Sequence, residues 1–248
     1  MSTPSIKVVA VGDSCAGKSC LLSKYTYDTI PVQYTRTVFD KFEAEVKLES
    51  QLYNLVLWDT PGDDDYDQMR PLSYPDTDVF LLCYSTVDPA SLTNLWQKWL
   101  KEVRKFADAN PVIIVVGLKS DARHDKTQRA IQARGGVVLT TEQGKSFAEA
   151  AGAAAFVECS ALKSRRVTDV FVAAAQASWR SKQTQRNSAF ATQPITTKKS
   201  KRWFTKKVSK VALWLGYDGY ACPDKRTNEE HNKKKEARTF DASHVSHA

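Results

Sequence analysis

A glycine-rich octet near the N-terminus stands between an apolar run and a helical pattern. It reads Gly12-Asp13-Ser14-Cys15-Ala16-Gly17-Lys18-Ser19, with Cys20 next, and fits the phosphate-loop pattern G-x-x-x-x-G-K-[ST]. Backbone amides of such a loop converge on phosphate oxygens at a helix N-terminus. Lys18 would neutralise β- and γ-phosphate oxygens, and the hydroxyl of Ser19 would ligate Mg²⁺. The octet therefore predicts binding of a nucleoside phosphate.

Three further polar stretches each follow a later apolar run. Asp59, in the stretch that ends at Gly62, lies where it would hold Mg²⁺ through water beside the loop. In Lys119-Ser120-Asp121, the carboxylate could accept both N1–H and the 2-amino group of guanine, a pair that adenine cannot complete. Ser160-Ala161-Leu162 offers backbone amides to an oxygen of the base. These spacings predict a guanine-nucleotide site with Mg²⁺.

The elements that must position these residues alternate along the chain. Strands are predicted at 6–11, 38–48, 51–58, 78–84, 112–117 and 154–159, and helices at 17–28, 91–108, 141–151 and 166–180. The second and third strands should pair as a hairpin around Glu49-Ser50. The alternation predicts an α/β P-loop fold with a six-stranded, mostly parallel sheet flanked by helices. Residues 122–136 are polar and predict a surface insertion with a short helix.

Length and charge divide the chain at about residue 180. Residues 1–180 of the 248 carry a net charge of −1, and residues 181–248 carry +9. We therefore expect a nucleotide-binding domain over 1–180 and a basic, partly disordered extension over 181–248. The sequence contains neither a spanning apolar segment nor an N-terminal signal, which favours a cytoplasmic protein. Its five cysteines show no pairing or zinc pattern, so reduced thiols are expected.

The motifs together resemble those of Ras-superfamily small GTPases, and most closely the Rho family. Beyond the nucleotide motifs, the strings that carry the resemblance are Tyr34-Thr35-Arg36-Thr37-Val38-Phe39-Asp40, Asp65-Tyr66-Asp67, Arg70-Pro71-Leu72-Ser73-Tyr74-Pro75 and Glu158-Cys159-Ser160-Ala161-Leu162. The likeness covers about residues 5–180, and segment 122–136 falls where Rho proteins carry an insert helix.

The resemblance implies roles for residues in two switch regions. The first switch is the string at 34–40, and the second switch runs from Pro61 through the strings at 65–75. Tyr34 would cover the phosphates, and Thr37 would ligate Mg²⁺ and sense the γ-phosphate. An effector face would be formed by Val38, Phe39, Asp40, Tyr66, Arg70 and Leu72. The resemblance further implies GTP and GDP as ligands, a monomer, and exchange factors as partners, with Trp58 resembling the residue by which Rac-like proteins select them.

Two departures from the family pattern concern hydrolysis. Ser14 stands where most Ras-like proteins have glycine, and its side chain would crowd the attacking water. Asp63 stands where the family has the glutamine that orients this water, and a carboxylate cannot donate the required hydrogen bond. We expect Asp63 to turn toward solvent, and Asp63, Asp64 and Asp65 to act mainly as first-turn acids facing a helix dipole.

Further departures concern nucleotide exchange. Ile30 replaces an aromatic residue beside guanine, Leu118 replaces the polar residue before Lys119, and Pro61 stiffens the second switch. The lost contacts imply nucleotide held about ten- to a hundredfold more weakly. Weak hydrolysis and fast exchange predict a mostly GTP-bound protein that recruits effectors, as in the Rnd-type atypical Rho proteins, although Asp63 and Ala16 differ from that subgroup. The alternative is a conventional GTP-hydrolysing switch cycled by exchange factors and activating proteins.

The basic extension ends without the cysteine motif for prenylation. Apolar residues recur at helical spacing within 201–216, namely Phe204, Val208, Val211 and Leu215, with Lys206, Lys207 and Lys210 to the side or opposite. This pattern favours an amphipathic helix on an anionic membrane surface, with Cys222 as a candidate acylation site. A helix docked on the body, or a basic nuclear-import or nucleic-acid patch, fits the same residues, and nucleic acid is the least favoured partner.

Overall fold

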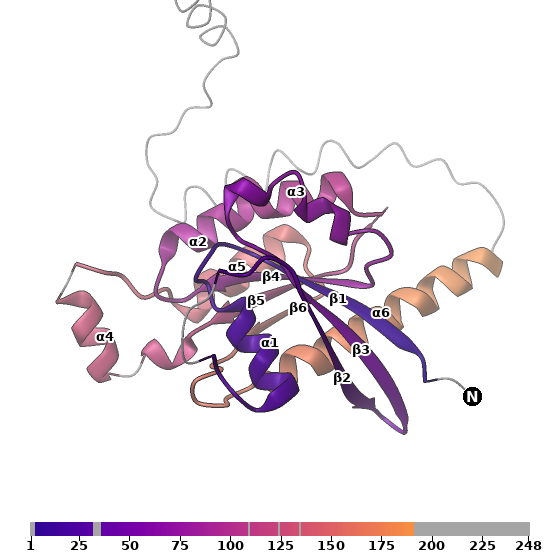
Figure 1. Ribbon diagram of the computed structural model, residues 1–248, viewed down its shortest axis with the longest axis horizontal. Coiled ribbons are helices and arrows are strands. Elements are labelled where there is room, and N and C mark those ends of the chain that lie inside the picture. The colour runs from indigo at the N-terminus through magenta and orange to yellow at the C-terminus, as the bar shows by residue number, and fades with distance from the viewer. Residues whose placement is uncertain (1–2, 32–35, 109, 124, 134, 191–248) are drawn as a thin grey trace, which may run out of the picture. The chain divides into compact units, whose positions relative to one another are not determined.

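The computed structural model describes residues 3–31, 36–108, 110–123, 125–133 and 135–190. Strands and helices alternate along these residues (Figure 1). The strands are β1 (Ser5–Val11), β2 (Asp40–Leu48), β3 (Gln51–Asp59), β4 (Val79–Ser85), β5 (Ile113–Leu118) and β6 (Ala155–Glu158). The α-helices are α1 (Lys18–Tyr27), α2 (Pro89–Asn94), α3 (Leu100–Phe106), α4 (Asp125–Gln132), α5 (Thr141–Ala151) and α6 (Val167–Phe190).

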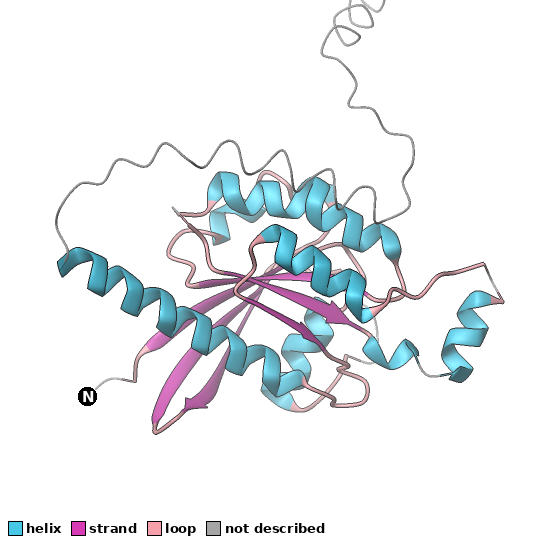
Figure 2. Cartoon of the chain, turned by 180° about the vertical axis from the view of Figure 1, so that it is seen from behind, coloured by secondary structure: helices cyan, strands magenta, loops and turns pink. Residues whose placement is uncertain are grey.

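The six strands form one sheet in the order β2-β3-β1-β4-β5-β6. Only the β2–β3 hairpin is antiparallel, and all other neighbours are parallel. Helices cover both faces of the sheet (Figure 2). The predicted α/β fold, its hairpin and its six strands are thus confirmed. The parallel strands run in one direction, so their carboxyl ends bring the phosphate loop and Asp59 to one edge of the sheet. The same edge carries the two base loops, 119–121 and 160–162, which are predicted to bind guanine.

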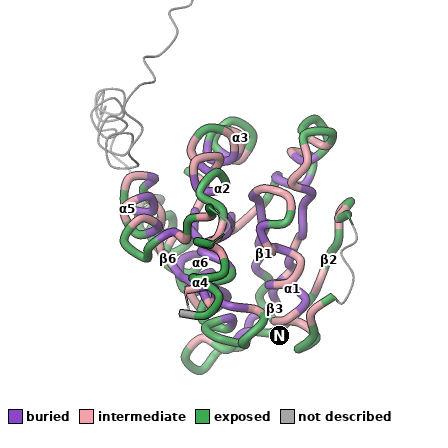
Figure 3. Tube along the Cα trace, turned by 90° about the vertical axis from the view of Figure 1, so that its left-hand side faces the viewer, coloured by how far each residue is buried: buried purple, intermediate pink, exposed green. Residues whose placement is uncertain are grey.

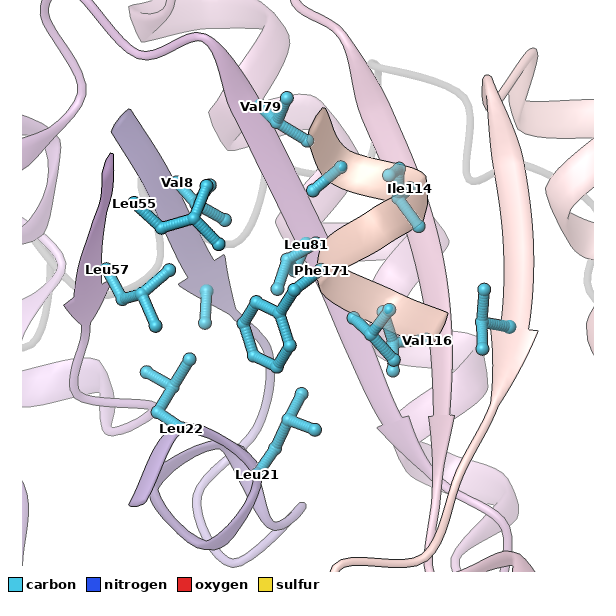
Figure 4. Close-up of a cluster of buried hydrophobic side chains, with 14 of the residues drawn as sticks. Val8, Leu21, Leu22, Leu55, Leu57, Val79, Leu81, Ile114, Val116 and Phe171 are labelled. Carbon is cyan, nitrogen blue, oxygen red and sulfur yellow. The ribbon is translucent and has the colours of Figure 1, made fainter. Parts of the chain in front are cut away.

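The larger apolar core lies between one face of the sheet and the helices α1 and α6. Figure 4 shows Phe171 of α6 in the centre of this cluster, between the strands and α1. Its labelled neighbours are Val8, Leu21, Leu22, Leu55, Leu57, Val79, Leu81, Ile114 and Val116, all almost fully buried. All seven residues of β4 are buried, which explains why its sequence is continuously apolar from Val79 to Tyr84 rather than alternating. Figure 3 shows the burial of the described residues, with exposed residues on the outer sides of the helices.

Two helices differ from the sequence pattern. The predicted helix at 91–108 begins at Pro89, capped by the Asp88 side chain, and widens into a π-type turn over Leu95–Trp99 before α3. The predicted helix at 166–180 continues to Phe190, since the polar residues after 180 include good helix formers. The insertion at 122–136 does contain a short helix, α4. Within the described part of the chain, no helix has the length and apolar character needed to span a membrane.

The predictions for the basic extension mostly concern residues outside those described. The predicted amphipathic helix at 201–216 and Cys222 lie outside the described residues. Tyr34 of the first switch also lies outside them. They stay predictions.

Candidate functional site

The phosphate loop is held in shape by two glycines with positive φ. Gly12 has φ 146° and lies so close to β4 that a Cβ there would come within 2.1 Å of the carbonyl oxygen of Cys83. Gly17 has φ 112° and forms the N-cap of α1. Both conformations are strained for any residue with a side chain, so the two glycines are required by the path of the loop. The loop therefore leaves β1 and enters α1 with its amides at the helix N-terminus.

Lys18, the first residue of α1, folds back under the loop. Its ammonium donates hydrogen bonds to the carbonyl oxygens of Gly12 at 2.7 Å and Asp13 at 2.9 Å. Only 6% of the residue is exposed, and this burial lowers its pKa, an effect that the nearby carboxylate of Asp59 opposes. The predicted phosphate-binding lysine is thus placed inside the loop, where a nucleotide phosphate would supply the missing negative charge.

Three oxygen-bearing side chains predicted to hold Mg²⁺ come together beside the loop. The hydroxyls of Ser19 and Thr37 lie 2.9 Å apart. Asp59 is fully buried, and neither carboxylate oxygen has a hydrogen-bond partner among the described residues. Burial raises its pKa to about 6, although Ser19, Lys18 and Thr37 favour the charged form. A buried carboxylate without donors, next to two hydroxyls, fits a small hard cation such as Mg²⁺.

The two base loops are joined to each other and to the phosphate loop. Lys119 donates from its ammonium to the carbonyl of Cys15 at 2.7 Å, and Ser160 donates from its hydroxyl to Asp121 at 2.5 Å. The amide of Ser120 donates to the carbonyl of Cys159 at 3.1 Å. The hydroxyl of Ser160 thereby fixes the Asp121 carboxylate, the group that we predict to recognise guanine.

The neighbours of these loop residues include the departures noted in the sequence. Leu118 is buried, with its side chain 3.5 Å from the position that a Cβ on Gly17 would occupy, so it packs on the phosphate loop without a hydroxyl or amide. Ile30 is half-buried, and Leu162 is largely exposed. The base side of the site therefore has apolar side chains at positions 30 and 118, where the family pattern has an aromatic and a polar residue.

Asp13 shows two partners that the sequence did not reveal. Its carboxylate accepts hydrogen bonds from the indole N–H of Trp99 at 2.6 Å and from the side-chain amide of Asn94 at 2.7 Å. Residues five apart lie on different faces of an α-helix, but the π-type turn between them brings both toward the loop. The carboxylate of Asp13 thus ties the loop to α2 and to the π-type turn that follows it. A regular 3.6-residue period gave no signal for this pair.

Arg70 does not belong to the exposed effector face, which corrects the sequence prediction. It is fully buried and donates to the carboxylate of Glu102 at 2.8 and 2.9 Å and to the carbonyl of Pro61 at 2.8 Å. Its guanidinium also lies over the ring of Trp99, 4.4 Å from the centroid. Arg70 therefore anchors the second switch to α3, because a buried guanidinium needs these partners.

The other predicted effector residues do lie at the surface or next to it. Val38 is 56% exposed and Leu72 is 78% exposed, while Asp40 is exposed at the start of β2. Phe39 and Tyr66 are partly buried, with their rings edge to face at 6.4 Å between centroids. Exposed apolar side chains on two neighbouring segments are suited to protein binding.

Asp63 does not turn to solvent, contrary to our expectation. Its carboxylate accepts a hydrogen bond from Nε of Arg36 at 2.6 Å, and this bond lowers its pKa. The hydroxyl of Ser14 also favours the charged form. Asp65 binds the same guanidinium at 2.7 Å, and Asp64 pairs with Lys98. The helix at these acids is a 3₁₀ turn of only three residues, Asp64–Tyr66, which is too short to have a strong dipole. The carboxylates are instead held by the side chains of Arg36 and Lys98.

Gly62, just before Asp63, lies directly against the phosphate loop. A Cβ on it would stand 2.2 Å from the amide nitrogen of Ser14 and 2.4 Å from the carbonyl carbon of Asp13. The second switch therefore touches the loop backbone at a position where only glycine fits.

Comparisons with known proteins agree with this geometry. The Ras family model matches residues 7–179. The chain is 44% identical over 178 residues to the GTP-binding protein RHO1 of Candida albicans, a match that covers 71% of this chain and 89% of that protein.

The contact of Gly62 with the loop gives a direct test. Gly62→Ala should weaken binding of a fluorescent GTP analogue by about tenfold or more, since overpacking against backbone costs about 1–3 kcal/mol. Equilibrium titration in Mg²⁺ measures this affinity. Gly136→Ala is the matched control, because the added methyl meets Ile131 beside α4, away from the loop. Unchanged affinity of Gly62→Ala would contradict the close packing of switch and loop.

Proposed function

The chain belongs to the Rho family of Ras-like small GTP-binding proteins, and from this premise we propose that it acts mainly in a GTP-bound form that recruits effectors. Its role as a GTP-binding signalling protein follows from the family. The GTP-loaded state is the finer proposal, and it is supported above all by Asp63, whose carboxylate is held by Arg36 at the place of the family glutamine.

The nucleotide would be held by the groups already described. Amides of residues 12–19 and the ammonium of Lys18 would bind the phosphates, and Asp121 would select guanine. Ser19, Thr37 and Asp59 would hold Mg²⁺, which when bound neutralises phosphate charge. Thr37 already lies against Ser19 in the described structure, so the phosphate side needs no rearrangement of this pair.

Hydrolysis is expected to be slow because two groups beside the γ-phosphate position are unsuited to it. Attack by water needs a side chain that accepts from the water and donates to the transition state, which Asp63 cannot do while charged. Its pKa is lowered by Arg36, so it stays charged at neutral pH. Ser14 adds a side chain on the loop, next to Gly62 and Asp63.

Exchange is expected to be fast because the base side lacks one polar and one aromatic contact that the family usually has. Leu118 fills its place with an apolar side chain, and Ile30 offers an aliphatic group where the family presents a ring. Each lost contact weakens nucleotide binding by about 0.5–1.5 kcal/mol. Since cytosolic GTP exceeds GDP, fast exchange and slow hydrolysis both favour the GTP form.

A conventional switch is the alternative. The arrangement of Thr37, Ser19 and the phosphate loop supports it, because these groups would respond to a γ-phosphate in any family member. An activating protein that supplies its own catalytic side chain would bypass Asp63.

The GTP-loaded proposal predicts that protein purified from cells carries mostly GTP, measured by chromatography of released nucleotide. Single-turnover hydrolysis should be slow, and the double variant Ser14→Gly/Asp63→Gln should speed it by about a hundredfold, the usual effect of restoring one catalytic group. Asp64→Gln is the matched control, because Asp64 is exposed and bound to Lys98. Mostly GDP in the purified protein, with an ordinary hydrolysis rate, would restore the conventional switch.

The exchange proposal predicts that Leu118→Thr and Ile30→Phe each slow release of a fluorescent GDP analogue by about two- to tenfold. Release is timed in Mg²⁺ with excess unlabelled nucleotide. Leu52→Thr is the control for the first variant, because this leucine of β3 is 41% exposed and lies outside the loops predicted to bind the base. A wild-type half-life of hours would remove the fast-exchange proposal.

We also propose that the protein sits at a cytosolic membrane face through its basic extension. The full chain should co-sediment with vesicles that contain phosphatidylserine and not with neutral vesicles. Replacing Lys206, Lys207 and Lys210 by glutamate should abolish binding, whereas the same change at Lys233, Lys234 and Lys235 should weaken it only slightly. Equal loss in both variants would mean that net charge alone acts, and no binding of the wild type would end the proposal.

A further inference from the structure

Arg36 joins the two switch segments through two ion pairs and a contact with an aromatic ring. Its Nε donates to Asp63 at 2.6 Å and its Nη2 to Asp65 at 2.7 Å. The guanidinium also lies over the ring of Tyr66, 5.6 Å from the centroid. One planar cation thus engages two carboxylates and one aromatic face of the second switch.

The two ends of this bridge adjoin the contacts by which the switches meet the nucleotide site. Arg36 precedes Thr37, whose hydroxyl lies 2.9 Å from that of Ser19. Asp63 follows Gly62, which packs on the loop backbone. The bridge is therefore one residue away from the predicted metal-binding hydroxyl on one side and from the loop contact on the other.

The second switch offers a fixed base for this bridge. Buried Arg70 donates to the carbonyls of Pro61 at 2.8 Å and Asp63 at 3.3 Å, and it is itself held by Glu102 of α3. Arg70 therefore links the backbone at Pro61 and Asp63 to α3. Arg36 attaches the first switch to a segment that is already anchored.

We propose that Arg36, Asp63 and Asp65 form a clasp that keeps the two switches together without a γ-phosphate. The effector face, with Val38 and Leu72 exposed on its two segments, then keeps one shape in the GDP and GTP forms. The clasp rests on the proposed function, because it describes how the effector face of that same site is regulated. In the usual switch, contacts to the γ-phosphate and Mg²⁺ order these segments; here an ionic contact within the chain takes over part of that task.

Charge chemistry explains why the clasp holds although it is partly exposed. The Arg36 side chain is 51% exposed and that of Asp63 is 24% exposed, so a single pair would contribute little. Because two carboxylates bind one rigid guanidinium, the conformational entropy lost by fixing the arginine side chain is shared between two ion pairs. The ring of Tyr66 adds a cation–π contact. High salt should weaken the clasp, since exposed ion pairs are screened.

The test is amide hydrogen exchange of residues 36–40 and 62–66 in the full chain, loaded with GDP or with a non-hydrolysable GTP analogue in Mg²⁺. Wild type should show nearly equal protection in both forms. Arg36→Ala should raise exchange in the GDP form by about three- to tenfold and leave the GTP-analogue form nearly unchanged. Adding Arg36→Ala to Asp63→Ala/Asp65→Ala should have no further effect.

Lys41→Ala is the matched control, because it removes the exposed Lys41–Glu43 pair within β2 without touching the second switch. A large difference between the GDP and GTP-analogue forms of wild type, or Arg36→Ala behaving as wild type, would overturn the clasp. Neither result depends on turnover, because the analogue is not hydrolysed. An ordinary hydrolysis rate would instead overturn the GTP-loaded proposal and leave the clasp standing.

Discussion

A buried ammonium at the carboxyl edge of a parallel sheet is the constraint on which the site depends. Lys18 is almost fully buried and bonded to two carbonyls of the loop that surrounds it. A charge in such a place needs compensation, which the loop carbonyls, Asp59 and a nucleotide phosphate supply together. The positive φ angles at Gly12 and Gly17 let the loop take the path on which its carbonyls meet this side chain.

The sheet and the nucleotide motifs were predictable because their signals are local. A strand covered on both faces, such as β4, is recognised by a continuous apolar run, and a loop between strand and helix by its glycines. Side-chain partners across the fold were not predictable. Asp13 meets Asn94 and Trp99 only because the helix widens between them, and Arg70 is buried only because Glu102 on α3 receives it. Nothing in the spacing of these residues reveals either contact.

The ion-pair partners of the acids in the second switch were likewise not predictable from the sequence. Three consecutive carboxylates suggested solvent or a helix dipole, yet each has a cation brought from another segment: Arg36 for Asp63 and Asp65, and Lys98 for Asp64. Asp67 in turn pairs with Arg70 and Lys98. The second switch is thus connected to the first switch and to the helix behind it by ion pairs, which are sensitive to salt and to single charge changes.

The departures from the family pattern act on opposite sides of the nucleotide. Leu118 and Ile30 remove polar and aromatic contacts from the base side, so they bear on how long a nucleotide stays. On the phosphate side, Asp63 accepts an ionic contact from Arg36, and by the proposed clasp this contact bears on the shape of the switches while the nucleotide changes. By the proposed clasp, the effector face does not distinguish GDP from GTP, and the proposed rapid exchange would then have less effect on effector binding. If the effector face keeps its shape with GDP bound, exchange of the nucleotide does not change effector binding, however fast the exchange is. The two groups are separable, since among the described residues Arg36 and Asp63 form their ion pairs within the switches and the side chains of Leu118 and Ile30 form none.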